Sequence, residues 1–494
     1  MPDSHVNRRS FLKTAAVAAL AASGPAAAEA SKMIGIQVGA ISFVDEGTER
    51  VLDVLQERAH VNTLFLAVFT YGRGIAGRQI PGQPLPDHGK QEYDLKFHGG
   101  NFATPHPQYY KNTVLDAKDT RAPDHGDLDI LAEVLPAARK RGMKTICWLE
   151  DVFRQDLRNV DKLQERDLYG RNAETLCLNN PDYRNFLAGL VEDYSRSYDI
   201  DGLMWGCERQ GALSDALGAT HDDPPIDPGN VTCFCQFCQE KAKQRGISVE
   251  RARQGFLELE KFVRAARSGK RPVDGYYVQF WRLLLRYPEL LAWEMLWTDS
   301  LRENYEAIYK TVKAAKANVP VGWHIWHNNS FNPIYRAEQD LRELSKYSDF
   351  IKLVMYNNCG GERMALYVDN IGSTLYGDLS KQGLLEFNYA VMNLKDRSYD
   401  QIPYTGLSAD YVYRETRRAL EGVAGTHTLI WPGIDIDIPT ETNHSKSTPQ
   451  AVKEAVMAAV RAGAPGGLLS RKYSEMKLAD LSGAGEAIRE LKLA

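Results

Sequence analysis

The chain has 494 residues, of which 44% are hydrophobic, and a formal net charge of −4. This length exceeds one small domain but fits one large barrel that carries insertions. Acidic and basic residues are interspersed, which excludes the basic surface of a nucleic-acid-binding protein and gives no membrane footprint. Aromatic residues make up 10% of the chain, with 24 Tyr and 8 Trp. That abundance fits a surface on which sugar rings stack, and it also fits a large core.

Residues 1–30 carry an export signal. Asn7-Arg8-Arg9-Ser10-Phe11-Leu12-Lys13 is a twin-arginine sequence ahead of an Ala-rich apolar stretch, and Ala28-Glu29-Ala30 is a small-x-small cleavage site. The alternative, a cytosolic protein with an Ala-rich tail, does not account for the Arg-Arg-x-Phe-Leu-Lys motif. We therefore expect a bacterial protein that the twin-arginine machinery exports to the periplasm or the medium. No later stretch is long and apolar enough to span a bilayer.

Short apolar segments alternate with amphipathic helical segments along the rest of the chain. The predicted strands are 34–38, 63–69, 144–149, 202–205, 319–325, 350–356, 428–431 and 467–470. The predicted helices between them are 46–58, 128–141, 183–198, 296–317, 337–347, 409–423 and 449–462. This pattern predicts an α/β fold, either a (β/α)8 (TIM) barrel or a doubly wound open sheet. The count of eight strands favours the barrel.

We expect residues 31–494 to form one catalytic domain with insertions at about 73–126, 207–294 and 357–408. Each insertion follows a predicted strand, which is where barrel enzymes build their active sites. Residues 384–389 also have the composition of a strand. Because a ninth strand would not fit the barrel, we assign this segment to the third insertion.

Polar side chains gather where the predicted strands end. In chain order they are Glu150, Asp151, Glu208, Arg209, His324, His327, Tyr356, Asn357, Asp435, Asp437, Arg471, Tyr473 and Glu475. Since apolar layers can fill a barrel, polar groups at the strand ends indicate an active site. Two carboxylates that face a sugar can hydrolyse a glycoside, because one protonates the leaving oxygen while the other attacks or activates water.

Three segments carry a family resemblance. They are Cys177-Leu-Asn-Asn-Pro181-Asp-Tyr183-Arg184, then Asp201-Gly-Leu-Met-Trp-Gly-Cys-Glu208, then Cys233-Phe-Cys235-Gln-Phe-Cys238. Together they resemble the core of family 42 β-galactosidases and related barrel glycosidases. The resemblance implies that Cys177, Cys233, Cys235 and Cys238 bind one Zn²⁺ and that Glu208 is the catalytic acid/base. A site closed by four thiolates leaves no position for water, so this zinc would be structural. Disulfide pairing is the alternative for these cysteines, although seven cysteines cannot form a complete disulfide framework.

The chain departs from that family at two positions. Cys207 stands where the family has an Asn, and the seventh strand reads Trp431-Pro-Gly-Ile-Asp435-Ile-Asp437 where the family has a nucleophilic Glu. We predict Asp435 as the nucleophile, Asp437 as the first alternative and Glu386 as a weaker one. In the simpler interpretation, Glu208 pairs with Arg209 at the surface and Asp435 forms a turn.

Other strand-end side chains are predicted to bind or orient the substrate: Glu150, Asp151, Arg209, His324, His327, Tyr356, Trp431, Tyr473 and Glu475. Cys147 and Cys359 have the character of buried thiols. The sequence thus predicts a glycosidase of the retaining kind that acts on a poly- or oligosaccharide or a glycoside. A sugar lyase or epimerase with His324 or His327 as its base stays open, as does a barrel that binds glycans without cleaving them. A homo-oligomer is compatible with the sequence.

Overall fold

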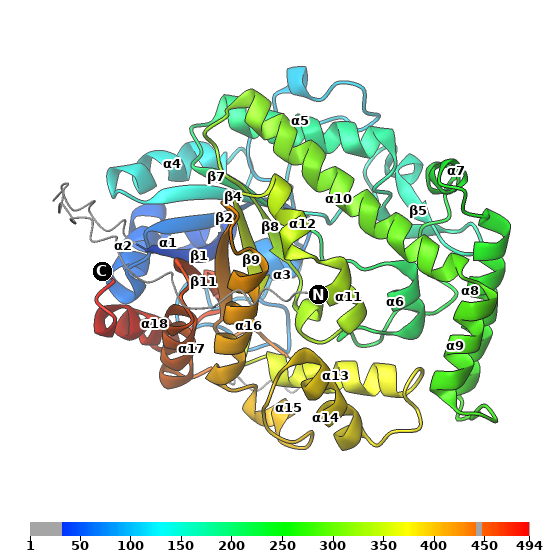
Figure 1. Ribbon diagram of the computed structural model, residues 1–494. Helices are drawn as coiled ribbons and strands as arrows, with labels where there is room; N and C mark the ends of the chain where they lie inside the picture. The colour runs from blue at the N-terminus through cyan, green and yellow to red at the C-terminus, as the bar shows by residue number, and fades with distance from the viewer. Residues whose placement is uncertain (1–31, 441–446, 494) are drawn as a thin grey trace, which may run out of the picture.

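The computed structural model describes residues 32–440 and 447–493, and it contains one closed barrel of eight parallel strands (Figure 1). Around the barrel these are β1 (Met33–Gly39), β2 (Thr63–Thr70), β4 (Lys144–Glu150), β7 (Gly202–Gly206), β8 (Val321–Ile325), β9 (Phe350–Val354), β10 (Leu429–Asp435) and β11 (Gly466–Ser470). β11 pairs with β1, which closes the ring. The short β3 (Gly100–Asn101) adds antiparallel to β2. The predicted (β/α)8 barrel is confirmed.

The barrel interior changes from apolar to polar along the strands. An apolar layer consists of Phe65, Ala67, Ile146, Trp148, Met204, Phe350, Trp431 and Leu468. Side chains alternate between the two faces of a strand, so Glu150 lies on the same face of β4 as Trp148. By the same alternation Lys352 follows Phe350 on the inner face of β9. The carboxyl ends of the strands therefore present polar side chains above the apolar layer.

Two glycines make room for large side chains inside the barrel. A Cβ atom at Gly322 would come within 2.2 Å of the ring of Phe350, and one at Gly433 would come within 2.6 Å of Cε of Lys352. Both distances are too short for real side-chain contacts. The small residues on β8 and β10 thus give the side chains of β9 their space in the interior.

Amphipathic helices surround the barrel in Figure 1: α2 (Thr48–Ala59), α4 (Ile130–Lys140), α5 (Pro181–Ser197), α10 (Glu289–Ala315), α16 (Ala409–Gly422), α17 (Pro449–Arg461) and α18 (Leu478–Glu490). α17 illustrates why these segments are helical. Thr448 caps its first turn by accepting a hydrogen bond from the backbone N–H of Ala451, and Pro449 occupies the first helical position. Its buried residues recur at spacings of three and four, as one helix face requires.

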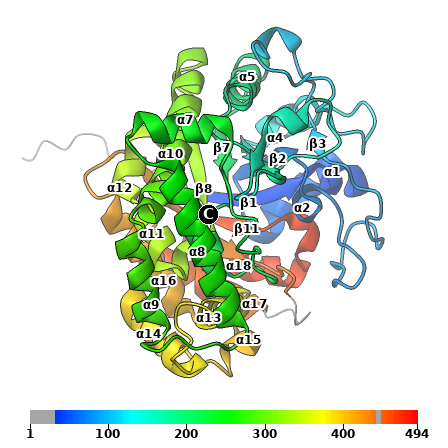
Figure 2. The same cartoon turned by 90° about the vertical axis from the view of Figure 1, so that its right-hand side faces the viewer.

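The long connections after β2, β7 and β9 contain further elements. After β2 lie α3 (Arg73–Ala76) and β3, and after β7 lie α6 (Ala212–Leu217), α7 (Gln236–Gln244), α8 (Val249–Arg267) and α9 (Tyr276–Arg286). Figure 2 shows α8 and α10 as long helices outside the barrel. After β9 lie α13 (Gly360–Gly372), α14 (Lys381–Met392) and α15 (Ile402–Thr405). A hairpin of β5 (Gln164–Arg166) and β6 (Asn172–Leu176) precedes α5. In the described part of the chain, no helix is both long enough and apolar enough to cross a membrane.

Two expectations about local structure are wrong. The segment 384–389 lies in α14, where Ser380 caps the first turn and Leu384, Asn388 and Met392 are buried at helical spacing. The predicted helix 337–347 is divided between α11 (Pro333–Glu338), α12 (Leu341–Leu344) and a short 3₁₀ turn. The division falls at Asp340, whose side chain accepts hydrogen bonds from the backbone of residues 342 and 343 and so starts a new helix.

Candidate active site and cysteine cluster

A cavity of about 270 Å³ lies at the carboxyl ends of the barrel strands. Its lining comes from the strand ends and from the three long connections: Gln37, Ile75, Trp148, Glu150, Glu208, His221, Asp222, Asp223, His324, Trp326, Tyr356, Glu362, Arg363, Leu366, Pro439, Thr440 and Arg471. Five of the strand-end side chains that the sequence analysis names, Glu150, Glu208, His324, Tyr356 and Arg471, reach it. The cavity combines carboxylates, aromatic rings and arginines.

A hydrogen-bonded chain of side chains leads from the barrel interior to Glu208. Nζ of Lys352 lies 2.8 Å from the hydroxyl of Tyr356 and 3.0 Å from Nδ1 of His324. Nε2 of His324 lies 2.7 Å from Oε1 of Glu208. Because an ammonium group only donates, Nδ1 of His324 accepts, and the ring proton on Nε2 is donated to Glu208.

The hydrogen bond from His324 and nearby positive charges keep Glu208 ionised. Desolvation in the cavity raises the pKa of Glu208, but the hydrogen bond from His324 and the charges of Arg363 and Lys352 outweigh it and bring the pKa to about 2. The side chain is 53% exposed because it points into the open cavity. Burial also lowers the pKa of Lys352 to about 7, against the attraction of Glu208. A negative carboxylate therefore faces the cavity at neutral pH.

The environment of Glu150 has the opposite effect. Burial raises the pKa of Glu150 to about 8, and the negative charge of Glu208 acts in the same direction. A hydrogen bond of 2.5 Å from the hydroxyl of Thr70 to Oε2 of Glu150 opposes this shift. Two carboxyl groups of one cavity thus have pKa values on opposite sides of neutrality, which is the electrostatic pattern of an acid and its partner carboxylate.

Asp435 and Asp437 do not line the cavity. Asp435 is completely buried, and its two carboxylate oxygens accept hydrogen bonds from the backbone N–H groups of Asn358 (3.1 Å) and Cys359 (2.8 Å). Asp437 accepts a hydrogen bond of 2.8 Å from the backbone N–H of Lys477. The side chain of Asp435 thus holds the segment that follows β9, and that of Asp437 holds the start of α18.

Trp431, Tyr473 and Glu386 also lie outside the cavity lining. Trp431 stacks on Phe350 in the apolar layer of the barrel, with ring centroids 4.2 Å apart. Tyr473 is buried and stacks on His88 at the same centroid distance. Glu386 lies on the exposed face of α14. The sequence analysis ended the predicted strand at residue 431, whereas β10 continues to Asp435, so Trp431 lies inside the strand and not at its end.

Glu475 and His327 contact cavity arginines without reaching the cavity. Glu475 forms an ion pair with Arg471. Nδ1 of His327 lies 3.2 Å from Nη1 of Arg363, and Nε2 lies 3.1 Å from the hydroxyl of Tyr411. The two predicted residues therefore support side chains that face the cavity.

Asp151 and Arg209 lie in a buried network behind Glu208. Nε of Arg209 donates to Oδ2 of Asp151 over 2.8 Å, and Nη1 lies 3.2 Å from Oε2 of Glu165. Cys207 donates to the same Asp151 oxygen over 3.1 Å. Arg209 therefore points away from Glu208, and the surface ion pair of the simpler interpretation is not formed.

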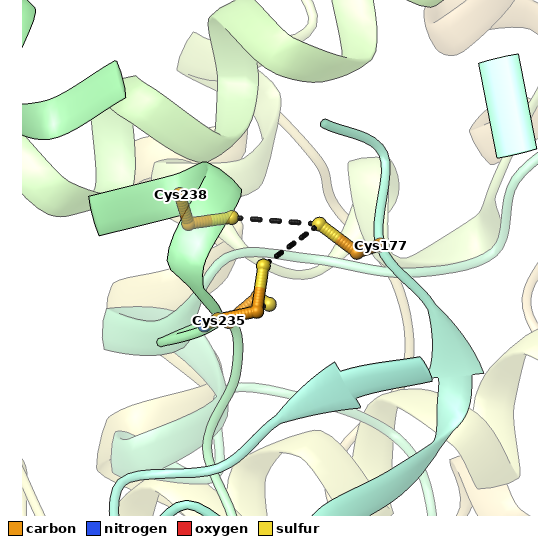
Figure 3. A group of neighbouring side chains, drawn as sticks. Cys177, Cys235 and Cys238 are labelled. Carbon is orange, nitrogen blue, oxygen red and sulfur yellow. Dashed lines mark hydrogen bonds between the residues drawn. The ribbon is translucent and has the colours of Figure 1, made fainter. Parts of the chain in front are cut away.

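Four buried cysteines form a cluster beside this network (Figure 3). Cys177 follows β6, Cys233 and Cys235 precede α7, and Cys238 lies in its first turn. The four Sγ atoms lie within 4.8 Å of one another, and Sγ of Cys177 is 3.4 Å from that of Cys235 and 3.6 Å from that of Cys238. All four thiols are free. Four sulfur atoms at these distances could hold one metal ion.

Glu165 connects the cysteine cluster to the network of Arg209. Its Oε2 accepts hydrogen bonds from the hydroxyls of Thr175 (2.6 Å) and Thr232 (2.8 Å). Thr232 directly precedes Cys233, and Thr175 lies two residues before Cys177. The two segments that supply the cysteines are thereby connected through Glu165 to Arg209, the residue that follows Glu208.

The functional residues that the sequence analysis missed are Lys352 and Arg363. Lys352 is the one charged residue in the apolar strand β9, and it lies four residues before Tyr356. Because side chains alternate along a strand, this spacing indicates that both point to the same side, and that was the available signal. Arg363 gave none, because it lies on a helix inside an insertion whose position relative to the barrel depends on tertiary packing.

Comparisons with known proteins agree with the export signal and the fold. The family model described as "TAT (twin-arginine translocation) pathway signal sequence" matches residues 5–25, so the chain carries a signal for export across the membrane. A search of curated proteins finds no match. A β-galactosidase from the Antarctic haloarchaeon Halorubrum lacusprofundi is similar in structure, with 13% identity over 93% of this chain and 58% of that one, and a TM-score of 0.54.

A β-galactosidase from Rahnella sp. R3 is 12% identical over 94% of this chain and 56% of that one, with a TM-score of 0.50. An α-L-fucosidase isoenzyme from Paenibacillus thiaminolyticus is 14% identical over 93% of this chain and 49% of that one, with a TM-score of 0.49. The chain thus spans only about half to three fifths of the length of these structures. At such identities the likeness concerns the fold alone, and the chain shares its barrel fold with the two β-galactosidases.

Proposed function

We propose that the protein is an exported glycoside hydrolase in which Glu150 and Glu208 are the two catalytic carboxyl groups. The observation that carries this proposal is that both line one cavity at the carboxyl ends of the strands while their pKa values are shifted in opposite directions. Glycoside hydrolysis needs one protonated and one ionised carboxyl group at the same time. The barrel fold of known glycosidases is consistent with this reading.

In this proposal Glu150 is the acid and Glu208 is the nucleophile or base. With a pKa of about 8, Glu150 is protonated at neutral pH and can donate its proton to the leaving glycosidic oxygen. Glu208 stays negative and can attack the anomeric carbon or activate a water molecule. This assignment replaces the expected role of Glu208 as acid and of Asp435 as nucleophile, because Asp435 is bonded to backbone N–H groups away from the cavity.

Aromatic side chains favour a carbohydrate as the substrate. Trp148, Trp326 and Tyr356 line the cavity beside the two carboxyl groups. Aromatic faces pack against the apolar faces of sugar rings, while the polar groups of the cavity can bind hydroxyls. We infer a poly- or oligosaccharide or a simple glycoside as the substrate class.

The cysteine cluster is proposed to bind one structural Zn²⁺. Tetrahedral zinc with Zn–S bonds of about 2.3 Å separates its sulfur ligands by roughly 3.8 Å, close to the distances of 3.4 and 3.6 Å from Cys177 to its neighbours. Four thiolates would close the coordination sphere, so the ion would hold the loop before α7 and take no part in the reaction.

A histidine-based lyase or epimerase is less well supported. His327 does not reach the cavity, and both nitrogens of His324 are engaged with Lys352 and Glu208. A proton abstracted by His324 would therefore have to displace one of these partners. Glu208 remains the better placed group to meet a substrate.

The test is a panel of aryl glycosides with the wild type, Glu208→Gln and Glu150→Gln. Glu208→Gln should lower kcat at least about 10³-fold, since it removes the charge that the reaction needs. Added azide should restore product release if Glu208 is a nucleophile. Glu386→Gln on the exposed face of α14 is the matched control and should retain full activity. The anomer formed first, followed by NMR, distinguishes retention from inversion.

Unchanged turnover in Glu208→Gln would overturn the proposal. Binding of sugars by the wild type without any product would favour the glycan-binding alternative.

A further inference from the structure

Arg363 is a charged cavity group with no acidic partner. It lies in the first turn of α13 and lines the cavity. Within residues 32–440 and 447–493, no carboxylate oxygen comes within 4.0 Å of its guanidinium group. Arg471, the other arginine of the lining, is in contrast paired with Glu475. Among the described residues, Arg363 thus has no ion-pair partner.

A neutral imidazole holds Arg363 in place. Nη1 of Arg363 lies 3.2 Å from Nδ1 of His327. A guanidinium group only donates, so Nδ1 accepts and the ring proton is on Nε2, which donates to the hydroxyl of Tyr411 over 3.1 Å. Burial, and then the charge of Arg363, lower the pKa of His327 well below its usual value, so the ring stays neutral.

The other rings near Arg363 carry no negative charge either. The guanidinium carbon lies 5.8 Å from the ring centroid of Tyr356. Burial, and then the charge of Arg363, lower the pKa of His221 to about 3, so this cavity histidine is neutral as well. Arg363 is therefore fixed among neutral rings, and among the described residues only His327 accepts a hydrogen bond from its guanidinium group.

Acidic side chains elsewhere in the cavity do not cancel this charge locally. Glu150, Glu208, Asp222, Asp223 and Glu362 also line it. Burial raises the pKa of Glu150 to about 8, and burial also raises that of Asp222. Of the carboxyl groups, Glu208 attracts Arg363 across the cavity without forming an ion pair. A desolvated guanidinium group in this state binds best to a planar anion that accepts two parallel hydrogen bonds.

We propose that the substrate is an acidic sugar and that Arg363 binds the carboxylate of a uronic acid unit in the cavity. The proposal rests on the proposed glycosidase function, whose substrate class it narrows. A free carboxylate would replace the missing acidic partner of Arg363, while His327 and Tyr356 hold the guanidinium plane in position. Neutral hexosides that lack this group would leave the charge of Arg363 unpaired, which disfavours their binding.

The first experiment compares matched aryl substrates, namely glucuronide with glucoside and galacturonide with galactoside. The wild type should prefer the acidic member of at least one pair by about 100-fold in kcat/KM. Arg363→Gln should reduce that preference at least about 30-fold, and Arg363→Lys should restore part of it. Arg414→Gln, which removes a surface arginine paired with Asp410, is the matched control and should keep the preference.

A second measurement does not depend on turnover. Titration calorimetry should show that free glucuronate or galacturonate binds the wild type more tightly than the neutral hexose, and that Arg363→Gln removes the difference. Cleavage of neutral glycosides with no preference for uronides, and no uronate binding, would refute the acidic-sugar proposal while leaving the glycosidase function intact. Uronate binding without cleavage of any glycoside would refute the glycosidase function instead. A preference for 6-sulfated sugars over uronides would also refute the carboxylate assignment.

Discussion

The ring of His324 lies between Glu208 and Lys352, and it donates to Oε1 of Glu208 over 2.7 Å while it accepts from Nζ of Lys352 over 3.0 Å. A buried amine is thereby connected to a carboxylate in the cavity through one neutral imidazole. The pair His324 and Glu208 sets the charge state on which the proposed hydrolysis depends.

Substitution of His324 should move the acidic limb of the pH profile. His324→Phe removes the hydrogen bond that opposes the effect of desolvation on the pKa of Glu208. Glu208 then ionises at a higher pH, so the acidic limb of kcat/KM moves upward, with an expected loss of about 10- to 100-fold in kcat. The measurement is kcat/KM from pH 3 to 9, with His427→Phe at the exposed position 427 as the control. An unmoved acidic limb would contradict this role.

The basic limb should report Glu150. A raised pKa of about 8 means that Glu150 loses its proton, and the reaction loses its acid, as the pH rises through that value. Thr70→Val removes a hydrogen bond that lowers the pKa, so the basic limb should move to still higher pH. Glu150→Gln should abolish the limb and spare aryl substrates whose leaving groups need little protonation. A basic limb that persists in Glu150→Gln would assign it to another group.

Lys352 should destabilise the fold below neutral pH. Its pKa falls from 10.5 in the unfolded chain to about 7 in the barrel. The unfolded state therefore binds more protons between about pH 7 and 10, and stability gained from this group rises with pH in that window. Lys352→Met should be more stable than the wild type by a few kcal/mol at pH 6, and the difference should shrink by pH 10. Urea unfolding at both values measures this, and a variant that is less stable at pH 6 would contradict the prediction.

Much of the fold was predictable because the barrel strands are continuous apolar segments bounded by polar residues. Alternation along those strands also places Glu150 and Glu208 at one rim. Strand-end position alone failed for Asp435, since backbone N–H groups from the neighbouring connection occupy its oxygens. Arg363 could not be foreseen, because the packing of α13 against the barrel is a contact between segments far apart in sequence.

The cysteine cluster should contain one zinc ion per chain. Cys235→Ser should lower the zinc content to below about a tenth of an equivalent and the melting temperature by about 5 °C or more, because a structural zinc site contributes folding free energy. Cys147→Ser, at a buried cysteine outside the cluster, should keep its zinc. Zinc analysis of both purified variants is the measurement. A disulfide bond between cysteines of the cluster in the wild type, seen as missing free thiols, would contradict the metal site.

Removal of Arg209 should harm both stability and turnover. Arg209→Met leaves Asp151 and Glu165 buried without their cation, which is expected to cost about 3–5 kcal/mol in unfolding free energy. Since Arg209 directly follows Glu208, kcat should fall too. Arg196→Met, at an exposed ion pair with Glu192, should change stability by about 0.5 kcal/mol or less. Equal losses of unfolding free energy in the two variants would contradict a stabilising role of the buried network.

The residues at position 433 on β10 and position 352 on β9 constrain each other's substitution. A methyl group at position 433 would come within 2.6 Å of Cε of Lys352, whose Nζ lies 3.0 Å from Nδ1 of His324. A larger residue at position 433 would therefore crowd the lysine at position 352, and a smaller residue at position 352 would relieve that contact. Each substitution is harmful or tolerated according to the state of the other, so the order in which the two arise is constrained.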